Sequence, residues 1–97
     1  MAIEYYDSVW DAIEDTPEEA LNMRLRSALM TKIANRVKEW GATQKEAANR
    51  LGITQPRLND LLNGRINKFS LDALVNLTGP AHLRLELEIK DEKEVAA

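Results

Sequence analysis

Polar side chains with hydrogen-bonding groups recur along residues 55–63, a stretch that the sequence predicts to be helical. The inward positions are leucines, and the outward positions are Gln55, Arg57, Asn59, Asp60 and Asn63. Arginine can donate two hydrogen bonds to guanine, asparagine and glutamine can pair with two atoms of adenine, and a carboxylate can accept from cytosine. The spacing therefore predicts a short helix with one face suited to reading base edges in the major groove.

The elements that would position this face begin at residue 43, where the first of two helix starts is predicted. Thr43 and Glu46 form a capping box, in which each residue satisfies a backbone amide of the other. Thr54 caps the second helix because its hydroxyl can accept from an amide of the first turn. Between the helices, Gly52 is expected to adopt a positive φ, which glycine tolerates because it has no Cβ. We therefore expect two helices joined by a tight corner over residues 43–64.

The alternative for this segment is an ordinary helical hairpin with a polar outer face. The order of residue types favours a helix-turn-helix motif, since Ala48 is followed by Gly52, the apolar Ile53, the cap Thr54 and the inward Leu58. In that motif the second helix enters the major groove, and the first lies across the DNA backbone.

The segment "ATQKEAANRLGITQPRLNDLLNG" and the following "FSLDALVNL" resemble the Xre/Cro-repressor-like helix-turn-helix regulators. Within that family they are most similar to the antitoxins encoded beside RelE/HigB-type toxins, and the resemblance covers residues from about 8 to 90. It implies an all-α fold, namely a five-helix Xre/lambda-repressor-like domain. It also implies a homodimer that binds a palindromic operator in double-stranded DNA, often in its own promoter.

The resemblance assigns roles to individual positions of the motif. Gln44 matches a glutamine that binds the DNA backbone, and Gln55 and Arg57 match groove-facing positions, with Asn59 and Asp60 on the same surface. The expected contacts with the DNA backbone are Gln44, Thr54, Arg65 and Lys68. The alternative for each basic residue is an ordinary solvated surface.

Charge is unevenly distributed along the 97-residue chain, whose formal net charge is −3. Residues 1–20 carry −7 and residues 69–97 carry −3, whereas residues 21–40 carry +4 and residues 41–68 carry +3. A basic middle that contains the motif is compatible with DNA binding, although an acidic chain as a whole is not typical of it.

Composition limits the other classes of protein. The length and a hydrophobic content of 44% fit one small domain. The absence of cysteine excludes disulfides and thiolate metal sites and fits a reducing compartment. We find neither a signal-peptide pattern nor an apolar run of about 20 residues, and we therefore expect a cytoplasmic protein without a membrane partner.

A long helix is predicted to precede the motif. Thr16, Pro17 and Glu19 mark its start, and Gly41 marks its end after Trp40. Its expected inward stripe is Leu21, Leu25, Ala28, Leu29, Ile33, Val37 and Trp40. After the motif, Ser70 is expected to cap a helix that Gly79 and Pro80 end. These boundaries divide the chain into an N-terminal arm with a short helix (1–15), a helical domain (16–80) and a C-terminal strand with an acidic tail (81–97).

The predicted strand lies within "LRLELEI", where Leu83, Leu85, Leu87 and Ile89 alternate with charged residues. A single strand needs a ladder partner. Antiparallel pairing with the same strand of a second subunit, in a register centred on Glu86 or on Glu88, would set opposite charges against each other. We therefore expect a twofold dimer joined through residues 83–89. The alternative partner is the N-terminal "AIEYY".

The acidic N-terminal arm combines carboxylates with large apolar side chains. Its candidate contacts with a basic RelE/HigB-like toxin, which the resemblance implies, are Tyr5, Tyr6, Trp10 and Asp11. The alternatives are a helix packed on the protein's own core and an acidic tail that aids solubility. A stand-alone phage-type or chromosomal Xre-family repressor, without a toxin, would carry the same motif.

Catalysis is not expected. His82 is the only histidine, and no cysteine, serine or acid accompanies it in a catalytic pattern. The sequence likewise predicts no cofactor and no metal site.

Overall fold

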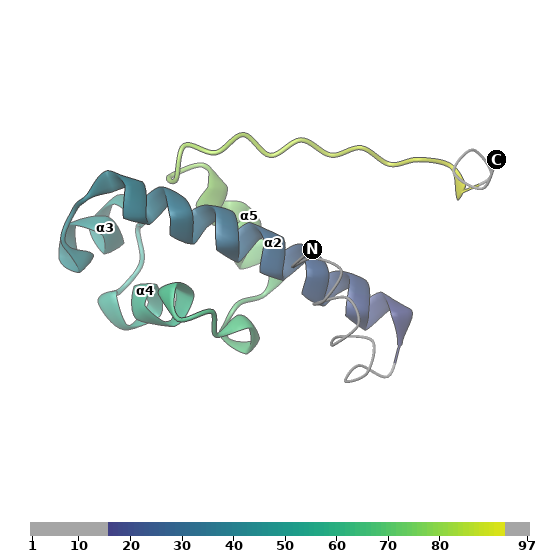
Figure 1. Cartoon of the computed structure of the whole chain (residues 1–97), viewed down its shortest axis with the longest axis horizontal. Helices are drawn as coiled ribbons and strands as arrows, with labels where there is room; N and C mark the ends of the chain where they lie inside the picture. The colour runs from purple at the N-terminus through teal and green to yellow at the C-terminus, as the bar shows by residue number, and fades with distance from the viewer. Residues whose placement is uncertain (1–15, 93–97) are drawn as a thin grey trace.

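The computed structural model describes residues 16–92 of the chain. In this part of the chain we find four α-helices, one 3-10 turn and no β-strand: α2 (Pro17–Trp40), α3 (Gln44–Leu51), α4 (Gln55–Leu62), η1 (Ile66–Lys68) and α5 (Leu71–Thr78) (Figure 1). The all-α class is confirmed. The fifth helix was expected in residues 1–15, which lie outside the described residues, so the helix count stays a prediction.

The long helix α2 has the predicted bounds because both of its ends carry the expected caps. The Thr16 hydroxyl accepts from the backbone amide of Glu19 at 3.1 Å, Pro17 occupies the first turn, and Gly41 ends the helix with a φ of 62°.

The predicted inward stripe of α2 is wrong in its N-terminal half. Leu21 and Leu25 are 48% and 45% exposed and Ala28 is exposed, whereas the buried positions are Ala20, Met23, Met30, Ile33 and Val37. Leu29 and Trp40 are half-buried against the core. The main cluster of buried residues starts at Met30, and the N-terminal half of α2 extends past it. The methionines therefore take the inward positions, and the leucines face outward.

The corner between α3 and α4 has the predicted geometry. Thr43 Oγ1 accepts from the amide of Glu46, and Glu46 Oε1 accepts from the amide of Thr43, both at 3.1 Å. Gly52 adopts a φ of 74°, and the amide of Ile53 donates to Ala48 O at 3.0 Å, which closes a Schellman motif. The small buried side chains of Ala47 and Ala48 let α4 pack closely on α3.

The core lies where α2 meets α4, η1 and α5 (Figure 1). Its largest fully buried side chains are Phe69, Ile33, Leu58, Leu61 and Leu74. These residues come from α2, α4, α5 and the η1 loop, so the core fixes the orientation of α4 relative to the rest of the domain.

α5 ends at the predicted place, and a hydrogen-bonded turn follows it. Gly79 has helical angles (φ −59°, ψ −62°), and the amide of Ala81 still donates to Leu77 O at 3.1 Å. Pro80 lacks an amide of its own but does not prevent this bond. The left-handed residue is His82, with a φ of 57°, and the amide of Leu83 reaches back to Thr78 O at 2.9 Å. The helix therefore ends at Gly79 as predicted, and the turn that follows it continues to His82.

Residues 83–90 leave α5 as an extended segment that runs toward the N-terminal end of α2 (Figure 1). Leu83 packs against the core, whereas Leu85, Leu87 and Ile89 are 51%, 84% and 83% exposed. Arg36 fixes the start of this segment, since its Nη1 donates to Ala81 O at 2.9 Å and to His82 O at 2.8 Å. No ladder forms within residues 16–92, so the strand stays a prediction.

Candidate nucleic-acid interface

The outer face of α4 carries a row of three side-chain amides. Gln55, Asn59 and Asn63 follow one another at intervals of four residues, and all three are exposed, whereas Leu58 and Leu61 point into the core. A helix places such positions on one face. The predicted base-reading positions Gln55 and Asn59 therefore lie on one exposed surface.

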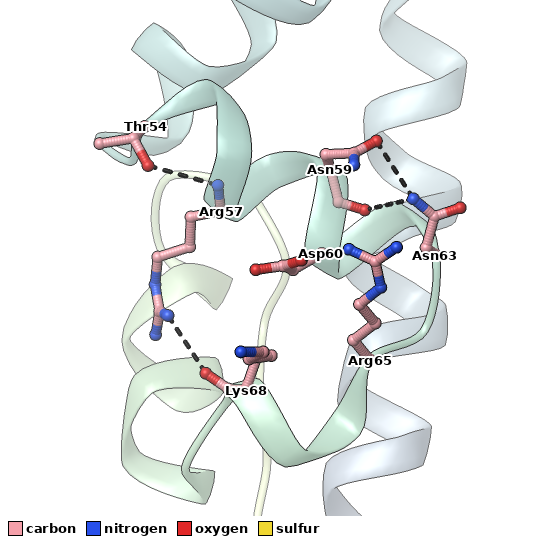
Figure 2. A network of polar contacts seen from close by, with 7 residues as sticks. All are labelled: Thr54, Arg57, Asn59, Asp60, Asn63, Arg65 and Lys68. Carbon is pink, nitrogen blue, oxygen red and sulfur yellow. Dashed lines mark hydrogen bonds and ion pairs between the residues drawn. The ribbon is translucent and has the colours of Figure 1, made fainter.

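Two members of this amide row are hydrogen-bonded to each other (Figure 2). Asn63 Nδ2 donates to the backbone oxygen of Asn59 at 2.9 Å and to Asn59 Oδ1 at 3.1 Å. These bonds restrict the Asn59 side chain before any ligand binds.

Arg57, another predicted base reader, is half-buried and already engaged. Its backbone amide donates to Thr54 Oγ1 at 3.3 Å, and its Nη1 donates to Lys68 O at 3.1 Å (Figure 2). Its guanidinium carbon also lies 4.3 Å from the centre of the Phe69 ring. Arg57 thus connects α4 to the loop that follows it.

Asp60 and Arg65 pair with each other. Arg65 Nη1 lies 2.7 Å from Asp60 Oδ1, and the Asp60 side chain is only 23% exposed. The pair joins a predicted base reader to a predicted phosphate contact, so Asp60 is less available to a base than the sequence indicates. Arg65 itself remains largely exposed.

The loop of residues 65–70 is held from the opposite side by Arg26 of α2. Its Nη1 donates to Ile66 O at 3.2 Å and to Phe69 O at 3.1 Å, and its Nε donates to Asn22 Oδ1 at 2.6 Å. These bonds fix the loop that carries the exposed Lys68, whose backbone oxygen accepts from Arg57 of α4 (Figure 2).

Sequence reasoning missed Arg26, although a signal was present. Arg26 continues the periodicity of the buried positions of α2, three residues after Met23 and four before Met30. An arginine at an inward position points to a buried set of acceptors, because a buried guanidinium needs hydrogen-bond partners.

Two predicted backbone contacts lie at the starts of the motif helices. Gln44 is the first residue of α3, and Thr54 is the N-cap of α4; both are exposed. The Thr54 hydroxyl is used within the fold as the acceptor for the Arg57 amide. Free amides at a helix start favour a nearby anion such as phosphate.

The capping box shifts the titration of Glu46. Hydrogen bonds from the Thr43 amide and hydroxyl lower the pKa of Glu46 from its usual 4.5, and nearby Arg50 lowers it further. Glu46 is therefore an ionised structural residue of α3.

The four predicted contacts with a toxin belong to the N-terminal arm. Tyr5, Tyr6, Trp10 and Asp11 lie outside the described residues. Within residues 16–92 we find no group of three or more histidine, aspartate or glutamate side chains that could hold a metal ion. None of the helices in this range has the length and apolar character needed to cross a membrane.

The capped pair α3 and α4, with its tight glycine corner and polar outer face, defines a helix-turn-helix domain, the DNA-binding part of transcriptional regulators. The chain belongs to a helix-turn-helix domain family, which it matches over residues 12–90. Membership of this family indicates a DNA-binding regulator. No curated protein matches the sequence.

Proposed function

We propose that the protein is a sequence-specific, Xre-type transcriptional repressor that binds its own promoter. The observation that carries the proposal is the exposed amide row of α4, which lies between the start of the motif and a loop with two exposed cations, Arg65 and Lys68. Amides of this kind read base edges, and cations beside them bind phosphates.

The base-reading set in this proposal is Gln55, Arg57, Asn59 and Asp60. Gln55 and Asn59 reach solvent directly, whereas Arg57 and Asp60 must first give up the contacts with Lys68 O and Arg65. The phosphate contacts are Gln44, Thr54, Arg65 and Lys68. In the proposed complex, Gln55 and Asn59 can contact bases directly, whereas the side chains of Arg57 and Asp60 must rearrange on binding.

A homodimer on a palindromic operator completes the proposal. Its supports are the alternating pattern of residues 83–89 and the exposure of Leu85, Leu87 and Ile89. Antiparallel pairing of two such segments would supply the missing ladder and set these apolar side chains beside those of the partner strand on one face.

We further propose an antitoxin role in the cytoplasm, in which the acidic N-terminal residues bind a basic RelE/HigB-like toxin. The sequence resemblance and the seven acids of residues 1–20 support it. Co-purification of the tagged protein with the product of the adjacent gene tests it. A chain that purifies alone but still binds its promoter would be a stand-alone repressor, the alternative function.

The test of DNA binding is a salt-titrated gel shift on the upstream promoter DNA, against a scrambled duplex of equal length. Tight, selective binding with a steep salt dependence is expected, and equal weak binding to both duplexes contradicts the proposal.

A pair of lysine variants sharpens this test. Lys68→Ala should reduce the magnitude of the slope of log K against log salt by about 0.9, the contribution of one phosphate contact. The matched control is Lys32→Ala, an exposed lysine on α2 one turn before Arg36, which should leave the slope unchanged. Equal slopes for the two variants would remove Lys68 from the interface.

A further inference from the structure

The orientation of the Asn63 amide is determined by the backbone. Its nearest partner is the backbone oxygen of Asn59, at 2.9 Å, and a carbonyl oxygen can only accept a hydrogen bond. The Asn63 side chain must therefore point Nδ2, rather than Oδ1, at the backbone oxygen of Asn59.

The orientation of Asn59 then follows from that of Asn63. The same Nδ2 carries a second hydrogen, which reaches the Asn59 side chain at 3.1 Å (Figure 2). Only an oxygen can accept it, so Asn59 turns Oδ1 toward Asn63. The Nδ2 group of Asn59 is left as its outward hydrogen-bonding group. Rotation of the Asn59 amide by half a turn would set two NH₂ groups against each other and break this bond.

We propose that Asn59 determines specificity as a hydrogen-bond donor and reads a keto base, guanine or thymine. Guanine offers O6 and N7 as acceptors in the major groove, and thymine offers O4. Pairing with adenine through two atoms requires an asparagine oxygen that faces the N6 amino group, and the bond from Asn63 turns the Asn59 oxygen toward Asn63 instead. The inference rests on the proposed function, because it concerns the base that the α4 surface selects.

The experiment is selection of bound sequences from a randomised DNA duplex library by the wild-type protein and two variants. Asn59→Asp keeps an acceptor for Asn63 but replaces the outward donor by an acceptor. At one position of each half-site, it should exchange the keto base for cytosine or adenine, whose amino groups donate. Asn63→Ala frees the Asn59 amide and should admit adenine at that same position. The expected change in preference there is about five- to 150-fold, the equivalent of one good base contact.

Asn76→Asp is the matched control, since it makes the same amide-to-acid change at an exposed position of α5, outside the proposed reading set. It should leave the position governed by Asn59 unchanged. Thermal melts of all variants separate altered base choice from loss of folding, and a merely structural Asn59 would change the melting temperature without changing the selected base.

The outcomes are distinguishable. Two results together support the inference. Asn59→Asp selects cytosine or adenine in place of the keto base, and Asn63→Ala accepts adenine at that position as well. Adenine selected by the wild type at that position overturns it, as do variants that alter no position of the selected sequence. A wild-type protein that enriches no sequence at all overturns the proposed function itself, and the inference with it.

Discussion

At the scale of single residues, much of the basic middle of the chain holds the fold together. Arg26 and Arg36 donate to backbone oxygens of two different loops, and Arg50 stacks on Trp40 with its guanidinium carbon 3.9 Å from the ring centre. A count of positive charges therefore overstates the surface available to DNA. Local exposure and pairing decide which cations are free to meet phosphates.

Arg57 is expected to contribute to both folding and binding. Arg57→Ala should weaken operator binding and relax base preference by about 1 to 3 kcal/mol, the value of one bidentate base contact. It should also cost about 1 kcal/mol of stability, because the cation–π contact of the half-buried guanidinium with the buried Phe69 ring is lost.

Gel shifts on the operator and on single-base variants measure the first effect, and thermal melts measure the second. Arg57→Lys is the control that keeps the charge but lacks the planar guanidinium. Operator affinity equal to that of the wild type would remove Arg57 from the reading set.

His82 occupies a left-handed backbone conformation that L-residues resist. With a φ of 57°, it is the only described non-glycine residue with a positive φ. His82→Gly should therefore raise the free energy of unfolding by about 0.5–1 kcal/mol, since the strain of the left-handed conformation exceeds the extra entropy of an unfolded glycine.

Urea unfolding of the variant measures this gain. Asn76→Gly, on the exposed side of α5, is the control and should destabilise by a similar amount, because a helical position favours residues other than glycine. A His82→Gly variant that is less stable than the wild type would show that the histidine side chain makes a contribution of its own.

At the scale of elements, the helix starts could be predicted because their signals are local. The starts of α2, α3 and α4 each have a threonine whose hydroxyl accepts from the backbone amide three residues later, namely Thr16, Thr43 and Thr54. Donor and acceptor thus lie within four consecutive residues of the sequence. The corner at Gly52 follows from the same short-range logic. These features fixed the bounds of α2, α3 and the start of α4 before any packing was known.

Features that depend on distant parts of the chain could not be predicted in the same way. The outward Leu21 and Leu25 depend on where the core ends, and the pairing of Arg57 with Phe69 depends on the path of the η1 loop. The candidate site was therefore predicted as a set of outward positions on α4. The network that restricts Arg57, Asp60 and Asn59 required the structure.

The capping box should make the start of α3 sensitive to acid. Because the pKa of Glu46 is lowered in the fold, its ionised form stabilises the protein above the usual pKa of about 4.5, and this contribution is lost as the pH falls through the lowered value. The melting temperature should therefore fall on acidification, less steeply in Glu46→Gln than in the wild type.

Thermal melts between about pH 6 and 3 measure this difference. Glu39→Gln, which removes an exposed acid on α2, serves as the matched control. Parallel curves for the wild type and Glu46→Gln would mean that the capping carboxylate contributes equally in both protonation states.

At the scale of the whole molecule, the exposed leucines of the C-terminal segment should control assembly. Leu87→Lys places a charge at a position that is 84% exposed in the single chain but faces apolar side chains of the partner strand in the proposed dimer. We expect a shift from dimer to monomer, and weaker operator binding because one protein then contacts only one half of the palindrome.

Light scattering coupled to size exclusion measures the assembly state over a range of concentrations. Val75→Lys, at an exposed apolar position on α5, is the control for a general effect of added charge. An unchanged dimer in Leu87→Lys would move the interface away from residues 83–89.

The two arginines of α2 have a consequence for the operator. Arg26 holds the loop that adjoins α4, and Arg36 holds the start of the C-terminal segment. They are ten residues apart on one continuous helix, or about 15 Å along its axis. In a dimer joined through the C-terminal segments, α2 of each subunit would thus set the distance between the two α4 helices. Promoters with one or two base pairs added between the palindrome arms should then lose binding, because the distance between the two α4 helices would no longer match the distance between the arms.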